Sequence, residues 1–416
     1  MLALRQTAWS LVALPRHLFR VARNILLLPV IVTRVSRGLL ADVAGEPDMD
    51  ALRTHLLLPF SDDFEETDRQ ARLDALIATI HARDWDSLLK RLSACETARR
   101  HTAGRSSYIA ETLATVGEAV ARQAEAGETA LLDALEDGAA AHPGSHLMAA
   151  LLAMAHIGLG WQARGTGFVP DIDPASADRF RAHFHRADRL LAPFDAVERY
   201  SPALAMAQYM LYPAHPEAGE RIEDWFADWA DLAPGTVNPY LTHGAQMLPK
   251  WFGADDAALD RAALRAAADS RDIWGNAGYT LTWLGAMDGA EPAQLAHCDG
   301  DLFLEGLTDL LDRSPSQHLV NRTALRLFRA WRARHVSPGP DPVARAVAAL
   351  QNRLGDGFRL VVGKYLHYGL PSVWGGEDDC LWHVGHAFLD EIAAGASIRF
   401  GERGAEIAFA EGPPAP

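Results

Sequence analysis

The chain has 416 residues, of which 49% are hydrophobic and 22% are charged. This composition excludes wholesale disorder, and the length exceeds one ordinary globular core, so we expect several domains or one extended array. The net charge of -15 excludes nucleic acid as a partner of the body, because an acidic surface repels phosphates. Three isolated cysteines indicate neither a disulfide framework nor a zinc knuckle, and they favour a cytoplasmic location.

Residues 1–41 are predicted to form a basic, amphipathic N-terminal arm. The arm holds six arginines and no acidic residue, so the rest of the chain carries all 54 acidic residues. On a helical wheel, Arg16, Arg20 and Arg23 lie opposite an aliphatic face. This pattern is typical of a helix on an anionic membrane at the cytoplasmic face, and equally of a helix that caps the first repeat. Both roles remain open for residues 1–40.

Residues 42–130 are predicted to form an N-terminal helical region. Leu73, Ile77 and Ile80 follow helical spacing, and Asp84 is placed to cap a helix that begins at Trp85. This region is therefore predicted to be helical up to the residues that follow it.

Helical patterning continues through residues 131–395, where Pro or Gly with a small polar residue marks most joints. The runs 131–143 and 230–234 place small residues before a closing proline, which resembles the tetratricopeptide pattern. The turn 248–253, Leu-Pro-Lys-Trp-Phe-Gly, resembles one found in uncharacterised bacterial helical-repeat proteins. The resemblance implies an all-α fold: a right-handed α-solenoid of tetratricopeptide-like helix pairs with a period of about 40 residues.

The chain also echoes itself, because residues 240–256 return in similar form as residues 365–379. The two copies end about three steps of 41 residues apart, which favours a repeat array. We expect Pro and Gly to make each turn and Trp to fill the space between helices. The predicted structural turn residues are Pro249, Trp251, Gly253, Pro371, Trp374 and Gly375. The acids after each turn are expected to cap the next helix, with acid–base chemistry as the alternative.

A second candidate site follows the later turn. On a continuous helix, Asp379, His383, His386 and Asp390 fall at i, i+4, i+7 and i+11 and share one face. Imidazole and carboxylate at this spacing are ligands for zinc or a related divalent metal. Because the stripe lies opposite the apolar face, the competing interpretation is a solvated polar face.

The last segment, residues 396–416, is predicted to form a short β-hairpin, with strands at 397–400 and 405–409, and a disordered tail from 411. The sequence as a whole favours a non-catalytic scaffold without a cofactor, which binds a protein or peptide partner on a concave helical surface. The alternative is a metal-binding module or metal-assisted enzyme that uses the Asp379 to Asp390 stripe.

Overall fold

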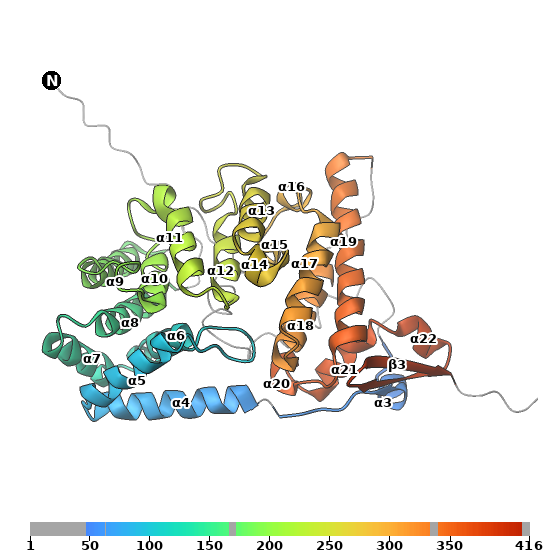
Figure 1. The fold of residues 1–416 in the computed structure, drawn as a ribbon, viewed down its shortest axis with the longest axis horizontal. Coiled ribbons are helices and arrows are strands. Elements are labelled where there is room, and N and C mark those ends of the chain that lie inside the picture. The colour runs from blue at the N-terminus through green and yellow to red at the C-terminus, as the bar shows by residue number, and fades with distance from the viewer. Residues whose placement is uncertain (1–46, 63, 166–171, 333–339, 410–416) are drawn as a thin grey trace, which may run out of the picture.

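The computed structural model describes residues 47–62, 64–165, 172–332 and 340–409. The predicted arm (1–41) and tail (411–416) lie outside these ranges, so neither prediction is tested. The described chain is mostly helical, with one small sheet near the C-terminus (Figure 1). The elements are α3 (Met49–His55), β1 (Leu56–Leu57), α4 (Phe64–His81), α5 (Trp85–Thr97), α6 (Tyr108–Glu125), α7 (Ala130–Ala141), α8 (His146–Arg164), α9 (Pro174–Leu191), α10 (Pro202–Tyr209), α11 (Ala218–Leu232), α12 (Asn238–Gln246), α13 (Ala258–Asp269), α14 (Arg271–Trp274), α15 (Ala277–Ala286), α16 (Pro292–Leu295), α17 (Gly300–Arg313), α18 (Gln317–Arg332), α19 (Pro342–Leu360), the π-helix η2 (Val361–Tyr365), α20 (Pro371–Trp374), α21 (Glu377–Gly385), α22 (Leu389–Ala393), β2 (Ala396–Gly401) and β3 (Gly404–Phe409).

Short polar residues begin many of these helices, as the sequence predicts. Asp84 accepts a hydrogen bond from the Ser87 amide at the start of α5. At α10, Ser201 accepts from the Leu204 amide at 3.1 Å, and a proline follows at the first helical position. A side-chain oxygen at this position satisfies an amide that has no partner within the helix, and proline has no amide to satisfy there.

The central helices are buried on all sides. Every residue of α15 is buried, and α15 packs against α12, α13 and α17. Glycines allow the α12–α15 contact: a Cβ on Gly244 would lie 1.9 Å from the Thr282 carbonyl oxygen, and one on Gly285 would lie 2.0 Å from that of Leu241. The two backbones therefore touch directly, and any larger residue at either position would push the helices apart.

The two echoed segments adopt different structures. Tyr240 to Gly244 lie within α12, whereas Tyr365 ends η2 and Gly369 forms a parallel bridge with Phe60. The Gly369 amide donates to the Pro59 carbonyl oxygen at 2.9 Å. The inference that the echo marks a structural repeat is therefore wrong.

The second turn still uses the predicted residues. Pro371 begins α20, and Gly375 ends that helix with a left-handed backbone, φ 102°. Trp374 is 1% exposed, and its Nε1 donates to the Asn321 Oδ1 at 2.6 Å. In the first turn Trp251 is only partly buried.

The first and last described strands meet in one sheet. β2 and β3 form the predicted antiparallel hairpin, with Phe400 opposite Ala405. The sequence did not predict β1, which pairs in parallel with β2, Leu56 opposite Ile398. In the order β1-β2-β3, the sheet thus joins the N-terminal segment to the end of the chain.

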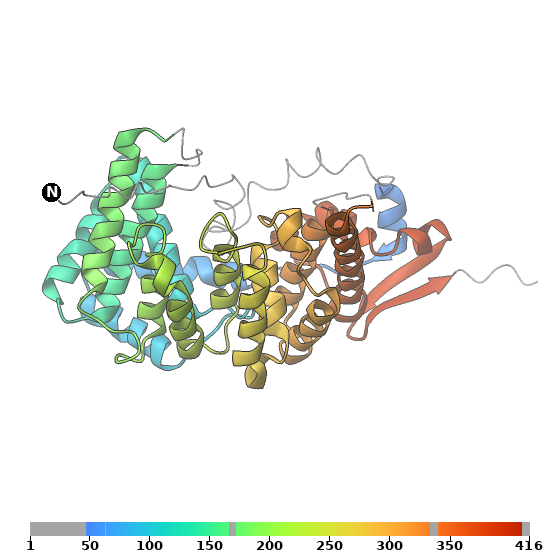
Figure 2. The same cartoon turned by 90° about the horizontal axis from the view of Figure 1, so that it is seen from above.

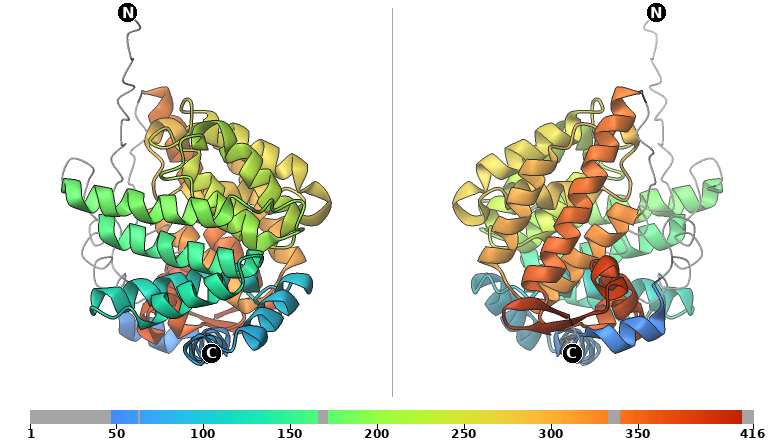
Figure 3. Two further views of the ribbon diagram at one scale, coloured as in Figure 1. Left: turned by 90° about the vertical axis from the view of Figure 1, so that its left-hand side faces the viewer. Right: turned by 90° about the vertical axis from the view of Figure 1, so that its right-hand side faces the viewer.

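From the sheet, the N-terminal segment runs beneath the helices to α4, at the other end of the molecule (Figure 1). The two end views place α7, α8 and α9 at one end and α19 with the strands at the other (Figure 3). Seen from above, the remaining helices fill the length between them (Figure 2). The helical class is confirmed, but the right-handed solenoid is not, because units of an open array contact only their neighbours.

The loop 101–107 lies at the centre of this arrangement (Figure 1). Its Arg105 carbonyl oxygen accepts from the Val237 amide at 2.9 Å, and the Ser107 amide donates to the Asn238 Oδ1 at 3.1 Å. The Arg105 Nε donates to the Ser314 Oγ at 2.7 Å. The loop thus joins the starts of α6, α12 and α18.

Among the helices in the described ranges, none combines the length and the apolar character needed to cross a membrane.

The burial of the two turn tryptophans yields the first prediction. Trp374→Ala is expected to lower the free energy of unfolding by about 3 to 5 kcal/mol, because it empties a filled core site and removes one of the two hydrogen bonds that the Asn321 Oδ1 accepts. Trp251→Ala is expected to cost clearly less, since its ring is already partly exposed. Urea unfolding of both variants measures the difference, and equal losses would contradict this account of the turns.

Candidate functional site

The predicted metal stripe does not lie on one continuous helix. α21 ends at Gly385, His386 forms its C-terminal cap, and Asp390 is an exposed residue of the separate helix α22. Both imidazoles are buried, with His383 7% and His386 4% exposed, so the expectation of a solvated polar face is also wrong.

Aromatic rings surround the two histidines. The Phe328 ring centroid lies 4.7 Å from that of His383 and 5.1 Å from that of His386, and Trp382 lies 4.5 Å from His386. Each Nδ1 donates to a carbonyl oxygen one turn earlier, that of Asp379 or that of Trp382. These contacts fix both rings within the core between α18 and α21.

The environment of His386 disfavours its charged form. Burial lowers its pKa to about 4, Arg332 acts in the same direction, and the hydrogen bond to Trp382 opposes the shift. Across the part of the chain that the structure describes, no three His, Cys, Asp or Glu side chains are grouped so as to hold a metal ion. Metal binding by Asp379, His383, His386 and Asp390 stays a prediction, without added support from the geometry.

The structure instead brings together arginines that the sequence analysis did not single out. Two adjoining pockets follow α6 and share Arg69, Glu111 and Thr115. We call the pocket between α4, α6, α12, α15 and α18 the inner pocket, the pocket between α4, α5 and α6 the outer pocket, and the two together the arginine groove. The five arginines that line the groove are Arg69, Arg72, Arg91, Arg322 and Arg326, and Glu111 is the one acid among its described lining residues.

In the outer pocket, Arg72 is held in place by several partners. Its guanidinium contacts Asp68, lies 4.0 Å from Glu111, and donates to the Tyr108 hydroxyl at 2.8 Å. It also lies over the Tyr108 ring, 4.2 Å from the centroid. Arg91 is exposed and, among the described residues, has no hydrogen bond or ion pair. Arg91 is therefore free to meet a ligand from solvent.

The inner pocket holds the more unusual cation. Within the described chain, Arg326 has neither a hydrogen bond nor an ion pair, although it is partly buried. Burial lowers its pKa to about 9, and the neighbouring charges of Arg322 and Arg329 act in the same direction against Asp288. Arg326 nevertheless stays protonated at neutral pH. Arg322, one turn earlier, contacts the His318 Nε2 at 3.5 Å.

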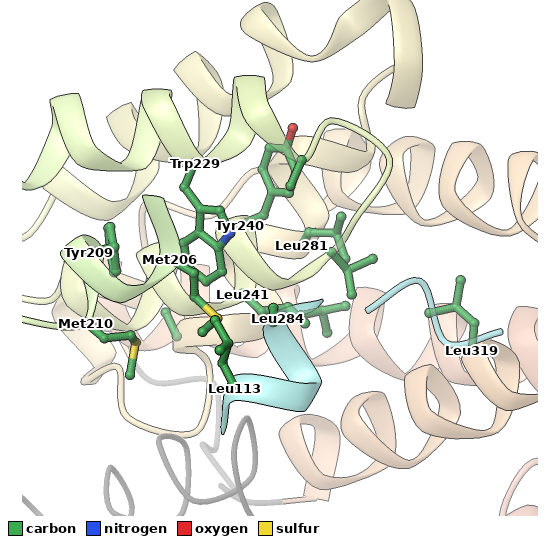
Figure 4. Packing of buried hydrophobic residues seen from close by; sticks show 14 of the residues in the cluster. Leu113, Met206, Tyr209, Met210, Trp229, Tyr240, Leu241, Leu281, Leu284 and Leu319 are labelled. Atoms are coloured by element: carbon green, nitrogen blue, oxygen red, sulfur yellow. The ribbon is translucent and has the colours of Figure 1, made fainter. Parts of the chain in front are cut away.

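The opposite side of the inner pocket is apolar. Leu241 of α12 and Leu281 and Leu284 of α15 form this wall, and Leu319 of α18 completes it. The first three lie close together in Figure 4. The cavity volume of the pocket is about 50 Å³, which is small beside the sites of drug-sized ligands and admits only a small group. Cations on one side and aliphatic carbon on the other suit an anion with a carbon stem.

Part of this site had a visible signal in the sequence. Arginines recur at 322, 326, 329 and 332, a spacing that gathers them along one side of a helix. The pairing of that side with α4 and α6 carried no such signal, because the sequence between α6 and α18 includes all the helices from α7 to α17.

Comparisons of the chain with protein-family models, with curated proteins and with solved structures gave no match. The resemblance to tetratricopeptide and bacterial helical-repeat proteins therefore stays a prediction, and the argument for function depends on the site itself.

A further buried histidine lies outside the groove. His243 is 2% exposed, stacks on Phe226 at 4.0 Å between centroids, and contacts the Tyr209 hydroxyl through its Nδ1 at 3.2 Å. Burial lowers its pKa to about 3, and Arg265 adds to the shift. His243 is therefore neutral in the folded protein.

This burial predicts a pH-dependent stability. Between pH 6.5 and about 3 the unfolded chain protonates His243 and the folded protein does not, so stability falls as the pH falls through this window. His243→Gln keeps a polar partner for Tyr209 but cannot titrate. Between pH 7 and pH 5 the variant is expected to lose about 2 kcal/mol less than the wild type in urea unfolding. His185→Gln, at an exposed position of α9, is the control, and an unchanged pH dependence in His243→Gln would refute the account.

Proposed function

We propose that this chain is a non-catalytic helical binding protein, and that its arginine groove receives an acidic segment of a protein or peptide partner. The observation that supports this is the concentration of five arginines against one acid among the described lining residues of two adjoining pockets, in a chain whose net charge is -15. The excess of arginines in the groove is opposite in sign to the balance of the whole chain, which has 54 acidic residues against 39 lysines and arginines.

The geometry of the groove gives the arginines different roles. Arg91 at the exposed end attracts an acidic segment from solution, because exposed charges accelerate association and are screened by salt. Arg72, fixed by Tyr108, presents its guanidinium in a defined orientation. Planar guanidinium groups bind carboxylates through paired hydrogen bonds, so an ordered arginine also contributes specificity.

The acidic residues elsewhere in the molecule also favour binding of an acidic segment at the groove. Apart from the basic arm, the acidic excess outside the groove repels acidic chains, so on the helical body such a chain gains attraction where the arginines gather. A basic chain would meet the reverse situation and bind elsewhere.

The proposal includes two features expected from the sequence. We place the protein in the cytoplasm, where Cys95, Cys298 and Cys380, each a free thiol here, would stay reduced. We also propose that the basic arm, residues 1–40, either contacts an anionic membrane or caps the helical body. The groove does not depend on which of these roles the arm has.

The test uses a fluorescent peptide of about ten glutamates as the probe. We expect it to bind at low ionic strength and to be released by salt, whereas a lysine peptide of equal length should bind more weakly. Arg91→Glu should weaken the glutamate peptide about fivefold, since reversal of one nearby exposed charge changes the energy by about 1 kcal/mol.

The control is Arg181→Glu, a reversal of another exposed arginine, which pairs with Asp178 on α9, outside the groove. It changes the net charge by the same amount and is expected to leave binding within about twofold of the wild type. Equal losses in the two variants would show that net charge alone governs binding and would overturn the proposal.

A further inference from the structure

The outer edge of the small sheet is exposed and apolar. β3 pairs with β2 on one side, and on its free side no backbone hydrogen bond joins it to any other described residue. Ile407 is 46% exposed and Phe409 is 61% exposed, and their spacing of two places them on one face of the strand. The hairpin lies at the end of the molecule away from α9 (Figure 1). β3 therefore presents both unpaired backbone groups and apolar side chains to solvent.

The helices cover only part of this face of the sheet. Residues directly opposite each other in an antiparallel pair share a face, and Ile398 of β2, opposite Ile407, is fully buried. α3 and α22 pack against β2, and the Phe388 ring lies 5.9 Å from that of Phe400 between centroids. η2 approaches β3 at Gly404, where the strand begins. The buried face of β2 therefore continues, exposed, onto β3.

β3 has no feature that would keep another strand away. Edge strands of soluble proteins usually carry a proline, a bulge or an inward-pointing charge, each of which prevents pairing with a second chain. The sequence of β3 is Gly-Ala-Glu-Ile-Ala-Phe, and its one charged residue, Glu406, alternates to the face opposite that of Ile407. Its register with β2 is unbroken over its full length, so it contains no bulge. This edge is therefore suited to accept a further strand.

The apolar face of β3 complements itself about a twofold axis. When two copies pair antiparallel with Ile407 opposite Ile407, Ala405 of one copy lies opposite Phe409 of the other. Within each copy Phe400 of β2 already lies opposite Ala405. Large and small side chains therefore alternate across the joined sheet, which lets the two copies pack without a gap or a clash.

The charged face of β3 tolerates the same pairing. In this register Glu406 of each copy lies opposite Ala408 of the other, so the two carboxylates do not face each other. Glu406 also keeps its ion pair with Arg403 of its own hairpin, at 3.0 Å. Apolar contact on one face and separated charges on the other favour a second copy of this chain over a strand of unrelated sequence.

We propose that two copies of this chain associate through antiparallel pairing of β3 with β3, which joins their three-stranded sheets into one. The strands exchange backbone hydrogen bonds, and the shared face buries Ile407 and Phe409. Because strands of this length bury little surface, the dimer dissociates on dilution. Among the described lining residues of the arginine groove, none belongs to the sheet, so this inference goes beyond the proposed function and does not depend on it.

Sedimentation velocity of the full-length protein is the first measurement. We expect monomers at low concentration and dimers as the concentration rises to about 1 mM, without larger species, because a twofold contact closes on itself. A protein that stays monomeric throughout this range, or that assembles beyond the dimer, would overturn the inference.

A matched pair of variants locates the contact. Ile407→Lys places two like charges opposite each other at the centre of the paired strands, and it should raise the dissociation constant of the dimer at least tenfold. Leu264→Lys on α13 is the control, because Leu264 is also 46% exposed and the change in charge is the same. It is expected to leave the dissociation constant within about twofold of the wild type. Equal effects of the two variants would contradict pairing through β3.

A cysteine at the same position tests the register without weakening the contact by charge. Opposite residues of antiparallel strands have Cα atoms about 4.5 to 5.5 Å apart, which is within reach of a disulfide. On mild oxidation Ile407→Cys should therefore form a covalent dimer faster than Leu264→Cys. The wild type, with its free Cys95, Cys298 and Cys380, gives the background rate. Equal rates in the two variants would overturn the proposed register and with it the inference.

Salt separates the β3 contact from association driven by opposite charges. Each copy has a net charge of -15, so two copies repel each other, and added salt should strengthen a contact made by backbone and apolar groups. The glutamate peptide is expected to show the opposite dependence. Dimers that dissociate as salt is added would be held by opposite charges, such as the basic arm of one copy against the acidic body of another, and would refute the β3 contact.

Discussion

The hydrogen bonds of the loop 101–107 are the constraint on which the rest of the structure depends. This loop connects α5 to α6 in sequence, yet its backbone meets the start of α12 at Val237 and Asn238, and its Arg105 side chain donates to Ser314, just before α18. A Cβ on Gly104 would lie 2.8 Å from the His318 ring, so the loop must approach α18 closely. Because the same three helices wall the inner pocket, the loop fixes the distance between the arginines of α18 and the acid of α6. A looser connection would leave the charges too far apart to share one ligand.

The sequence predicted the local structure well and the long-range arrangement poorly, for a physical reason. Helix starts such as Asp84 and Ser201 depend on residues within one turn, and the hairpin 397–409 depends on adjacent strands, so both leave a local pattern. The echo misled because similar residues have different neighbours. Gly244 lets α12 touch α15, whereas Gly369 lies against Phe60 in an extended segment. The backbone of each copy is set by what packs against it, and the sequence of the copy alone does not contain that information.

The same limit explains the candidate sites. The histidine stripe requires one continuous helix from Asp379 to Asp390, but α21 stops at Gly385 and Phe328 of α18 covers both imidazoles. The sequence pattern therefore suggested a solvent-exposed face, because it does not reveal that α18 packs against these histidines. The arginine groove shows the converse error. Arg322 and Arg326 would pass for a solvated helix face, and only the approach of α4, α6, α12 and α15 turns that face into the wall of a pocket.

The energetics of the groove connect its architecture to binding. Arg72 is compensated by Asp68, Glu111 and Tyr108, so the outer pocket keeps its shape without a ligand. Arg326 has no such compensation, and the surrounding packing must hold it in place. The outer pocket is therefore organised before a ligand binds, whereas in the inner pocket binding relieves an unfavourable charge. An anion that reaches the inner pocket gains the attraction of Arg326 and also removes a cost that the free protein carries, so the site favours ligands that insert over those that bind only at the mouth. Because Arg326 is partly buried and unpaired, the groove favours ligands that reach into the inner pocket.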